Sequence, residues 1–316
     1  PMKDIDKYYW SPNYTYSTNW EQFPTTTQGI AAMGGGSVNI DAAGEVFGQI
    51  GTFGQGDLTI TSGKDLNGRF LNRNGDMTLS AMGSFGTLDD GQVIEVFDTR
   101  LDLAAQGNIS LASIANPTIA SNMLGVAEFE GADLWNLTYE QETSASLSAR
   151  TGTILFSGEP VKHDGENGQS LHDATKASVL PGNVALSAGQ DIIFQLNYFM
   201  APAETGQLSM TAGRDIIGTN DAGDNFRLTM TNVDTALIYG SHHDTDPMPM
   251  QLLQDTNQNS AFIHEGDAES VVISAGRDIE SISLTVPKSA SVTAVRDIRN
   301  IEYFGQNLTP DDVTQI

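Results

Sequence analysis

The chain has 316 residues, of which 40 are Asp or Glu and 15 are Lys or Arg, so its formal net charge is −25. This excess of negative charge argues against binding to nucleic acid or to anionic membrane surfaces. The sequence contains no cysteine, so disulfides do not hold the fold together. No apolar run approaches the roughly 20 residues that a membrane-spanning helix needs.

Residues 1–33 differ from the rest of the chain because aromatic residues crowd into them without a clear period. We interpret this segment as one that caps the end of the following domain or lies along its flank. Three of its side chains, Trp10, Tyr14 and Trp20, could stack on sugar rings. Packing against the domain is the alternative, and we favour it over a carbohydrate site.

From residue 34 onward a nine-residue motif recurs along the chain. The clearest copies are Leu58–Leu66, Val184–Ile192, Leu208–Ile216 and Val271–Ile279, and Ala290–Ile298 differs from them only at the glycine. Looser copies begin at Val38, Met77, Ile109, Ala145 and Leu228. The shortest steps between copies are 19 and 20 residues. Such self-similarity predicts a solenoid with coils of about 20 residues, and the longer steps then cover two coils or one coil with an insertion.

Apolar residues at alternating positions of the motif predict a strand with one buried face. In one copy these residues are Leu208, Met210 and Ala212, and the residues between them are Ser and Thr. The glycine that follows predicts a residue with positive φ or a β-bulge, and the aspartate two positions later can accept amide hydrogen bonds in the corner. The repeated corner residues are Gly63, Asp65, Gly189, Asp191, Gly213, Asp215, Gly276, Asp278 and Asp297. Several arginines near these corners, namely Arg150, Arg214, Arg277 and Arg296, are expected to pair with the acids.

A coil of about 20 residues cannot enclose a core alone, but it can when it stacks on its neighbours. We therefore predict an all-β fold for residues 34–316, a right-handed parallel β-helix with loop insertions, since right-handed crossovers dominate parallel connections. The register of the motif places Leu58, Val184, Leu208 and Val271 in the interior. A β-sandwich is the alternative, but sandwich strands do not normally share a consensus of this length.

Three stretches interrupt the repeats, near residues 115–142, 158–178 and 236–269, and we interpret them as loops that leave the β-helix. The second and third of them contain all five histidines, which are His163, His172, His242, His243 and His264. The chain also stops within a motif at Asp312–Ile316, so we expect it to be a segment of a larger protein.

Catalysis by paired carboxylates must be weighed, because some β-helix proteins cleave polysaccharides. The candidate carboxylates are Asp89, Asp90, Asp164, Asp173, Asp244 and Asp246. A glycosidase needs two carboxylates about 5–9.5 Å apart, which is a matter of tertiary structure. Since no sequence pattern specifies an acid, a base and a substrate clamp, we expect no enzymatic activity.

A bound metal is also not expected. The stretch Asn220–Asn225 has the oxygen-rich composition of a calcium loop, with Asp221 and Asp224 as the candidate ligands. It lacks the twelve-residue spacing and the bidentate Glu of such loops, so a simple turn is the preferred interpretation. The stretch His242–Asp246 could bind a metal, but adjacent histidines in a polar loop are mostly solvated. We therefore expect no cofactor, with calcium as the one candidate.

Several segments together point to a known family. They are Ser274–Ile279, Leu284–Lys288, Arg296–Asn300, Gly305–Leu308, Gly68–Leu71 and Leu79–Gly86. With these segments, which cover residues 30–316 in patches, the chain resembles the filamentous haemagglutinin family of large exoproteins. The resemblance implies a β-helix shaft secreted by a Gram-negative bacterium. The family's amino-terminal secretion domain and carboxy-terminal effector regions are not recognisable here.

The resemblance also implies a function and partners. Proteins of this family act in adhesion, biofilm formation or contact-dependent interaction at the cell surface. The implied partners are an outer-membrane two-partner secretion transporter, glycans or proteins on host or neighbouring cells, and adjoining coils of the same filament. The competing hypothesis is a β-helix polysaccharide lyase or glycoside hydrolase. A groove with converging carboxylates would favour the enzyme, and a continuous surface of hydroxyls and amides would favour the shaft.

Overall fold

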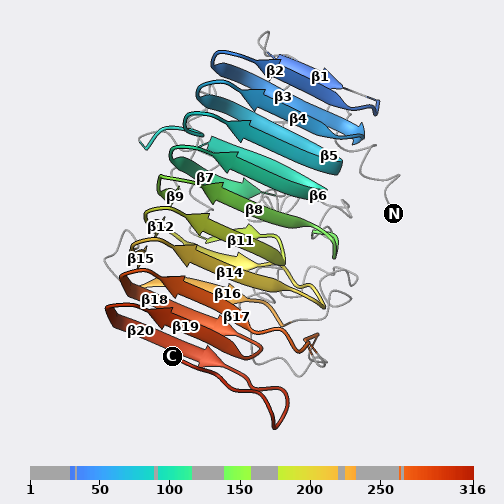
Figure 1. Ribbon diagram of the computed structural model, residues 1–316. Helices are drawn as coiled ribbons and strands as arrows, with labels where there is room; N and C mark the ends of the chain where they lie inside the picture. The colour runs from blue at the N-terminus through green and yellow to red at the C-terminus, as the bar shows by residue number, and fades with distance from the viewer. Residues whose placement is uncertain are drawn as a thin grey trace, which may run out of the picture.

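The computed structural model describes residues 29–32, 34–88, 92–115, 139–157, 177–219, 225–232, 263–264 and 267–316. Within these residues the chain forms twenty strands and no helix, so none of them belongs to a helix that could span a membrane. The strands wind as successive coils stacked along one axis (Figure 1). Every pairing between them is parallel. The predicted parallel β-helix is confirmed.

Each coil crosses three sheet faces in turn, which we call A, B and C. Face A contains β2 (Val38–Ala42), β4 (Leu58–Ser62), the last parts of β5 (Leu66–Ala81) and β6 (Gln92–Ala105), β8 (Ser144–Ala149), β11 (Asn183–Ala188), β14 (Gln207–Ala212), β17 (Val271–Ala275) and β19 (Ala290–Ala294). Face B contains the first parts of β3 (Val46–Gln55), β5, β7 (Ile109–Ala115), β18 (Asp278–Val286) and β20 (Asp297–Gly305), together with β9 (Ile154–Phe156), β12 (Ile192–Phe194) and β15 (Ile216–Gly218).

Face C completes the coil. It contains β1 (Gly29–Ala32), β10 (Ala177–Leu180), β13 (Asn197–Met200), β16 (Phe226–Met230), the middle of β5, the first part of β6 and the last parts of β3, β7, β18 and β20. The long strands β3, β5, β6, β18 and β20 therefore pass from one face to the next without a break. Strand β1 lies inside the sequence segment 1–33, and its pairing with β3 makes it part of the stack.

The register of face A corrects two of the predicted repeat starts. Met77 pairs with Leu101, and Leu101 pairs with Ala145, so a copy of the motif begins at Leu101. The expected starts at Ile109 and Leu228 are wrong, because Ile109 lies on face B and Leu228 lies on face C. The physical reason is that all three faces alternate apolar and polar residues, so a strand on face B or C imitates the face A pattern.

Inward side chains form columns along the axis of the β-helix. The four residues expected in the interior, Leu58, Val184, Leu208 and Val271, are at most 3% exposed, so this prediction is confirmed. The last inward position of face A holds a column of buried alanines just before the chain bends: Ala81, Ala105, Ala149, Ala188, Ala212 and Ala275. The small side chain suits a corner where two faces converge. Nearly all inward residues belong to one continuous hydrophobic cluster.

Aromatic rings fill the interior where faces B and C meet. The rings of Phe156 and Phe194 stack with centroids 5.1 Å apart. The next residue in this column is Gly218, and a Cβ there would overlap the side chain of Phe226. Glycine thus leaves room for Phe226, whose ring stacks on Phe194 at 4.3 Å with an angle of 2° between the planes. Tyr198 packs edge-on against the same stack.

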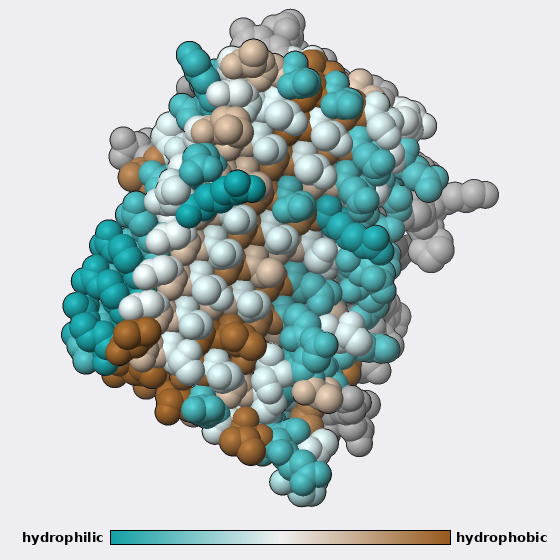
Figure 2. Space-filling model, in the orientation of Figure 1, coloured by the Kyte–Doolittle hydropathy of each residue, from teal (hydrophilic) through white to brown (hydrophobic). Residues whose placement is uncertain are grey.

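The outer surface of face A carries mainly small hydroxyl side chains. Its outward residues are Asn39, Asp41, Thr59, Thr61, Thr78, Ser80, Asp102, Ala104, Ser146, Ser148, Ala185, Ser187, Ser209, Thr211, Val272, Ser274, Ser291 and Thr293. Figure 2 shows this face as rows of residues of intermediate hydropathy, bordered by strongly hydrophilic residues. Two aspartates are the only charged groups among these outward positions, although the chain as a whole carries a net charge of −25.

The strand β15 offers a direct test of the register. Ile216 points inward and is fully buried, whereas its neighbour Ile217 is only partly buried. We expect Ile216→Asp to destabilise the protein by about 4 kcal/mol or more, because it buries a charge without a partner and removes apolar contacts. The control Ile217→Asp adds the same charge on the outer side and should cost much less. Thermal and denaturant unfolding of the two variants measure the difference, and equal destabilisation would contradict the inward assignment.

Candidate functional site

The corner between faces A and B brings together the glycines and aspartates that recur in the sequence. Gly63, Gly189, Gly213 and Gly276 each follow the last residue of a face A strand, so their predicted place in the corner is confirmed. The expected reason was wrong, because none of the four has a positive φ or lies at a register shift. Instead, a Cβ on any of them would overlap a carbonyl oxygen of the preceding coil, which belongs to Ala43, Arg150, Gly189 or Gly213. Glycine is needed here because the backbones of two coils approach closely.

The corner aspartates link one coil to the next. Asp65 accepts a hydrogen bond from the amide of Ser84 at 2.7 Å, and Asp215 accepts one from the amide of Asp278 at 3.0 Å. Asp191 and Asp278 accept equivalent bonds from the amides of the following aspartates, Asp215 and Asp297, at 3.1 and 3.2 Å. The prediction that these side chains accept amide hydrogen bonds is confirmed. The amide donor belongs to the next coil, however, and not to the same turn as in an Asx turn.

Two coils use other side chains for the same purpose. The hydroxyl of Ser84 accepts the amide of Asn108 at 3.1 Å, and the Asn108 side chain accepts the amide of Thr153 at 2.9 Å. Sequence reasoning missed these positions because the motif was defined by aspartate. The shared property is a short side chain with an acceptor oxygen.

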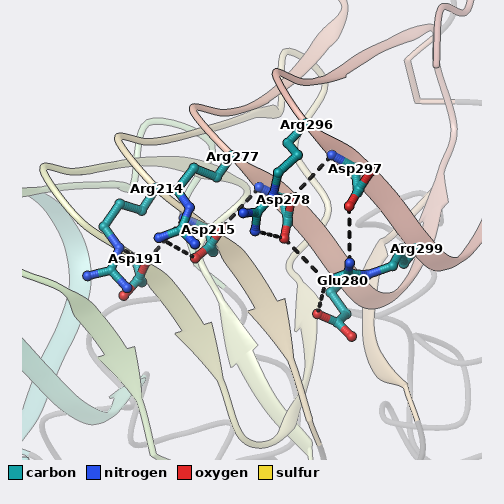
Figure 3. A network of polar contacts seen from close by, with 9 residues as sticks. All are labelled: Asp191, Arg214, Asp215, Arg277, Asp278, Glu280, Arg296, Asp297 and Arg299. Carbon is teal, nitrogen blue, oxygen red and sulfur yellow. Dashed lines mark hydrogen bonds and ion pairs between the residues drawn. The ribbon is translucent and has the colours of Figure 1, made fainter.

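Arginines cover three successive aspartates of this column, Asp191, Asp215 and Asp278 (Figure 3). The Nε of Arg214 lies 3.4 Å from Oδ1 of Asp191, and Nη1 of Arg277 lies 3.7 Å from Oδ2 of Asp215. Arg296 forms a two-pronged contact with Asp278, with its Nε 2.6 Å from Oδ1. Each arginine thus reaches back from its own coil to the carboxylate of the preceding coil. Three of the four predicted arginine–acid pairs are confirmed.

The fourth predicted pair, at Arg150, is wrong. Arg150 occupies the corner position that glycine fills in later coils, one residue before the position of the pairing arginines. It forms no ion pair with any residue that the structure describes. No sequence pattern pointed to Arg299, whose guanidinium lies 3.2 Å from Asp278, 3.1 Å from Glu280 and 3.1 Å from Asp297.

The network is held in its ionised form. The Asp278 side chain is only 5% exposed beneath the arginines. The hydrogen bond from Arg296 lowers the pKa of Asp278 from 3.8 to about 2, although burial opposes the shift. Hydrogen bonds to Asp278 and Glu280 raise the pKa values of Arg296 and Arg299 respectively. A general acid in polysaccharide cleavage needs a raised carboxyl pKa, so Asp278 is poorly suited to that role.

Most other candidate residues fall outside the described part of the chain. These are the carboxylates Asp89, Asp90, Asp164, Asp173, Asp244 and Asp246, the calcium candidates Asp221 and Asp224, the aromatic residues Trp10, Tyr14 and Trp20, and His163, His172, His242 and His243. Among the residues that the structure does describe, no group of three His, Cys, Asp or Glu side chains is placed to hold a metal ion.

Comparisons of the chain with protein-family models, with curated protein sequences and with solved structures give no match. The fold and the geometry of the corner are therefore the basis of the functional proposal.

The corner glycines can be tested with a matched pair of variants. We expect Gly213→Ala to destabilise the protein by roughly 1–3 kcal/mol, because its Cβ overlaps the backbone of Gly189 and overpacking of this kind forces the coils apart. Gly44→Ala places the same methyl group where no atom lies within 4 Å, so it should be neutral or slightly stabilising. Denaturant unfolding compares them, and equal stability of the two variants would contradict close coil contact as the reason for glycine.

The Asp278 network predicts a specific dependence of stability on pH. The pKa of Asp278 is lower in the folded state than its ordinary value, so its contribution is present above about pH 4 and is lost as the pH falls through about 2. We expect Asp278→Asn to lower the melting temperature at pH 7, with the difference from wild type shrinking between pH 4 and 2. Asp102→Asn is the control, since Asp102 is exposed on face A and pairs with no described residue. A pH-independent effect of Asp278→Asn would count against the ionic network.

Proposed function

We propose that this chain is a structural shaft segment of a large secreted bacterial surface adhesin, acting in adhesion, biofilm formation or contact-dependent interaction. The observation that carries the proposal is the use made of the repeated polar side chains. Asp191, Asp215 and Asp278 each bind the coil that comes after them, through a backbone amide and an arginine. These polar groups recur at the corner between faces A and B in successive coils, and their hydrogen bonds and ion pairs join one coil to the next. They therefore support the length and rigidity of the rod.

Two further observations support a shaft. The outer surface of face A is a nearly uncharged array of serine and threonine, which is the continuous hydroxyl surface expected of a shaft. The sequence motifs also resemble those of filamentous haemagglutinin-family exoproteins, whose secretion uses an outer-membrane two-partner transporter. On this proposal the protein is located outside the cell or on its surface. Its partners are that transporter, adjoining coils, and glycans or proteins of host or neighbouring cells.

The alternative is a β-helix enzyme that cleaves polysaccharides. The corner aspartates are spaced by one coil, about 4.8 Å, which is near the separation of the two carboxylates in retaining glycosidases. Their chemistry opposes that role, because Asp278 is ionised and bound to two arginines at neutral pH. The corner is therefore better explained as a stacking device than as an acid–base pair.

A shaft should tolerate a change in its number of coils. Residues 271–289 form one coil of 19 residues, since Val271 pairs in register with Ala290. We expect a tandem duplication of residues 271–289, with Lys288 of the second copy replaced by Met because that copy would lack Asp267, to give a folded protein with an unchanged melting temperature, lengthened by about 4.8 Å. Small-angle X-ray scattering and thermal unfolding measure both properties. Aggregation or a large loss of stability would contradict interchangeable coils.

The same preparations should be inert toward polysaccharides. Incubation with pectins and with acidic and neutral glycans, followed by chromatography of the products, should show no cleavage by either length of the protein. Cleavage that disappears on substitution of Asp89, Asp90, Asp244 or Asp246 by Asn would overturn the shaft proposal in favour of the enzyme.

A further inference from the structure

The corner between faces C and A contains a buried ionic cluster that has no counterpart in the other coils that the structure describes. It consists of His264, Asp267 and Lys288, whose side chains are 1%, 7% and 1% exposed. The Nζ of Lys288 donates hydrogen bonds to Oδ2 of Asp267 and to the carbonyl oxygen of Gly206, both at 2.7 Å. A buried lysine is stable when its charge is paired and its donors are used, and both conditions hold here.

The cluster fastens residues 263–264 and 267–270, which precede β17, to the stack. The amide of Ile263 donates to the side chain of Asn232, and the hydroxyls of Ser270 and Ser289 lie 2.7 Å apart. Within the segment, the amide of Asp267 donates to the carbonyl oxygen of His264 at 3.0 Å. Asp267 is thus the link between this segment and Lys288 on the next turn of the β-helix.

The imidazole of His264 is the exceptional member of the cluster. Its Nδ1 lies 3.7 Å from Oδ2 of Asp267, which is too long for a direct hydrogen bond. Neither ring nitrogen has a hydrogen-bond partner among the described residues. The ring packs beside Gly206, where an added Cβ would come within 3.1 Å of Cε1. A neutral imidazole fits this site, because it carries no charge that would need a partner.

Protonation would change this balance. Among the residues that the structure describes, the charged groups that face His264 are Lys288 and Asp267, and the neutral backbone of Thr231 is a further polar neighbour. An imidazolium would be a second buried cation beside Lys288, with one carboxylate to compensate both, and that carboxylate already binds Lys288. Burying an uncompensated charge is costly, so the protonated ring is expelled from the site.

We propose that His264, Asp267 and Lys288 form an acid-sensitive lock, which holds residues 263–264 and 267–270 on the corner between faces C and A at neutral pH and releases them in mildly acidic solution. The mechanism is the repulsion and desolvation of a second buried cation. It does not depend on whether the protein is a shaft or an enzyme.

The expected directions of the pKa shifts agree with the geometry. Burial lowers the pKa of His264, Lys288 lowers it further, and Asp267 opposes the change. Because the folded-state pKa lies below the ordinary value of 6.5, stability is lost as the pH falls through 6.5 toward the folded-state pKa. Burial alone would raise the pKa of Asp267, but hydrogen bonds from Lys288 and from the amide of Glu269 bring it below its ordinary value of 3.8. Protonation of Asp267 therefore plays no part between pH 7 and 5.

Hydrogen–deuterium exchange of the purified chain tests the lock. At pH 5.0, after correction for the intrinsic exchange rate, we expect the protection of residues 263–264 and 267–270 to fall severalfold relative to pH 7.5, because protonation of the buried His264 ring destabilises their closed arrangement. Protection of β14 should be unchanged at both values and serves as the internal reference. In His264→Phe, an aromatic replacement that cannot titrate, the protection of 263–264 and 267–270 should not depend on pH. Acid release of the same size in His264→Phe, or none in the wild type, would overturn the proposal.

A second variant distinguishes electrostatic coupling from a merely structural role. Lys288→Met removes the repulsion of the imidazolium but leaves the ring buried, so we expect the acid-induced loss of protection of residues 267–270 to be smaller than in the wild type. Retention of the wild-type acid release in Lys288→Met would contradict repulsion by Lys288. Should either variant fail to fold, NMR titration of the His264 Cε1 proton in the wild type decides the matter. A pKa of 6.5 or above would refute the lock.

Discussion

The close approach of successive backbones at the corner between faces A and B constrains most of this structure. Amides of one coil bond carbonyl oxygens of the coil before it, as in the 2.8 Å bond from Gly213 to Ala188. At this spacing a Cβ on Gly213 or Gly276 would overlap a carbonyl oxygen. The alanine column beneath the corner has the same cause, since two faces converge there. A corner that is this tight leaves room only for short acceptor side chains to satisfy the amides that point along the axis.

The close spacing of the coils also brings the corner aspartates near one another, and arginines offset their charge. A column of aspartates along one edge would repel itself in a chain whose net charge is −25. In the last coils the arginines Arg214, Arg277 and Arg296 separate the carboxylates and neutralise them locally. Because each guanidinium reaches back by one coil, the ion pairs join the coils as the backbone hydrogen bonds do. Little of the negative charge that remains lies on face A, whose outward positions named above include only the two aspartates Asp41 and Asp102.

The two polar corners differ in kind. The corner between faces A and B repeats one solution, and its Asp278 carboxylate stays ionised because arginine and a backbone amide both favour the charged form. The corner between faces C and A holds a unique cluster, in which Lys288 bonds Gly206 across 82 residues of sequence. There a neutral histidine is packed among charges that are already paired. The β-helix can thus be uniform along the corner between faces A and B and still carry a local, pH-dependent cluster at the corner between faces C and A.

The fold class, the inward positions of the strongest motif copies and the place of glycine and aspartate at corners could all be predicted from the sequence. This was possible because a nine-residue pattern recurring at a fixed phase repeats one local structure. The register of the weak copies needed the tertiary structure, since Leu101, Ile109 and Leu228 show the same alternation on three different faces. The reason why glycine is needed at the corner also required the tertiary structure, because the carbonyl oxygen that a Cβ would overlap belongs to another coil. The cluster around His264 lay beyond any pattern in the sequence, because its members meet only when coils distant along the chain are stacked.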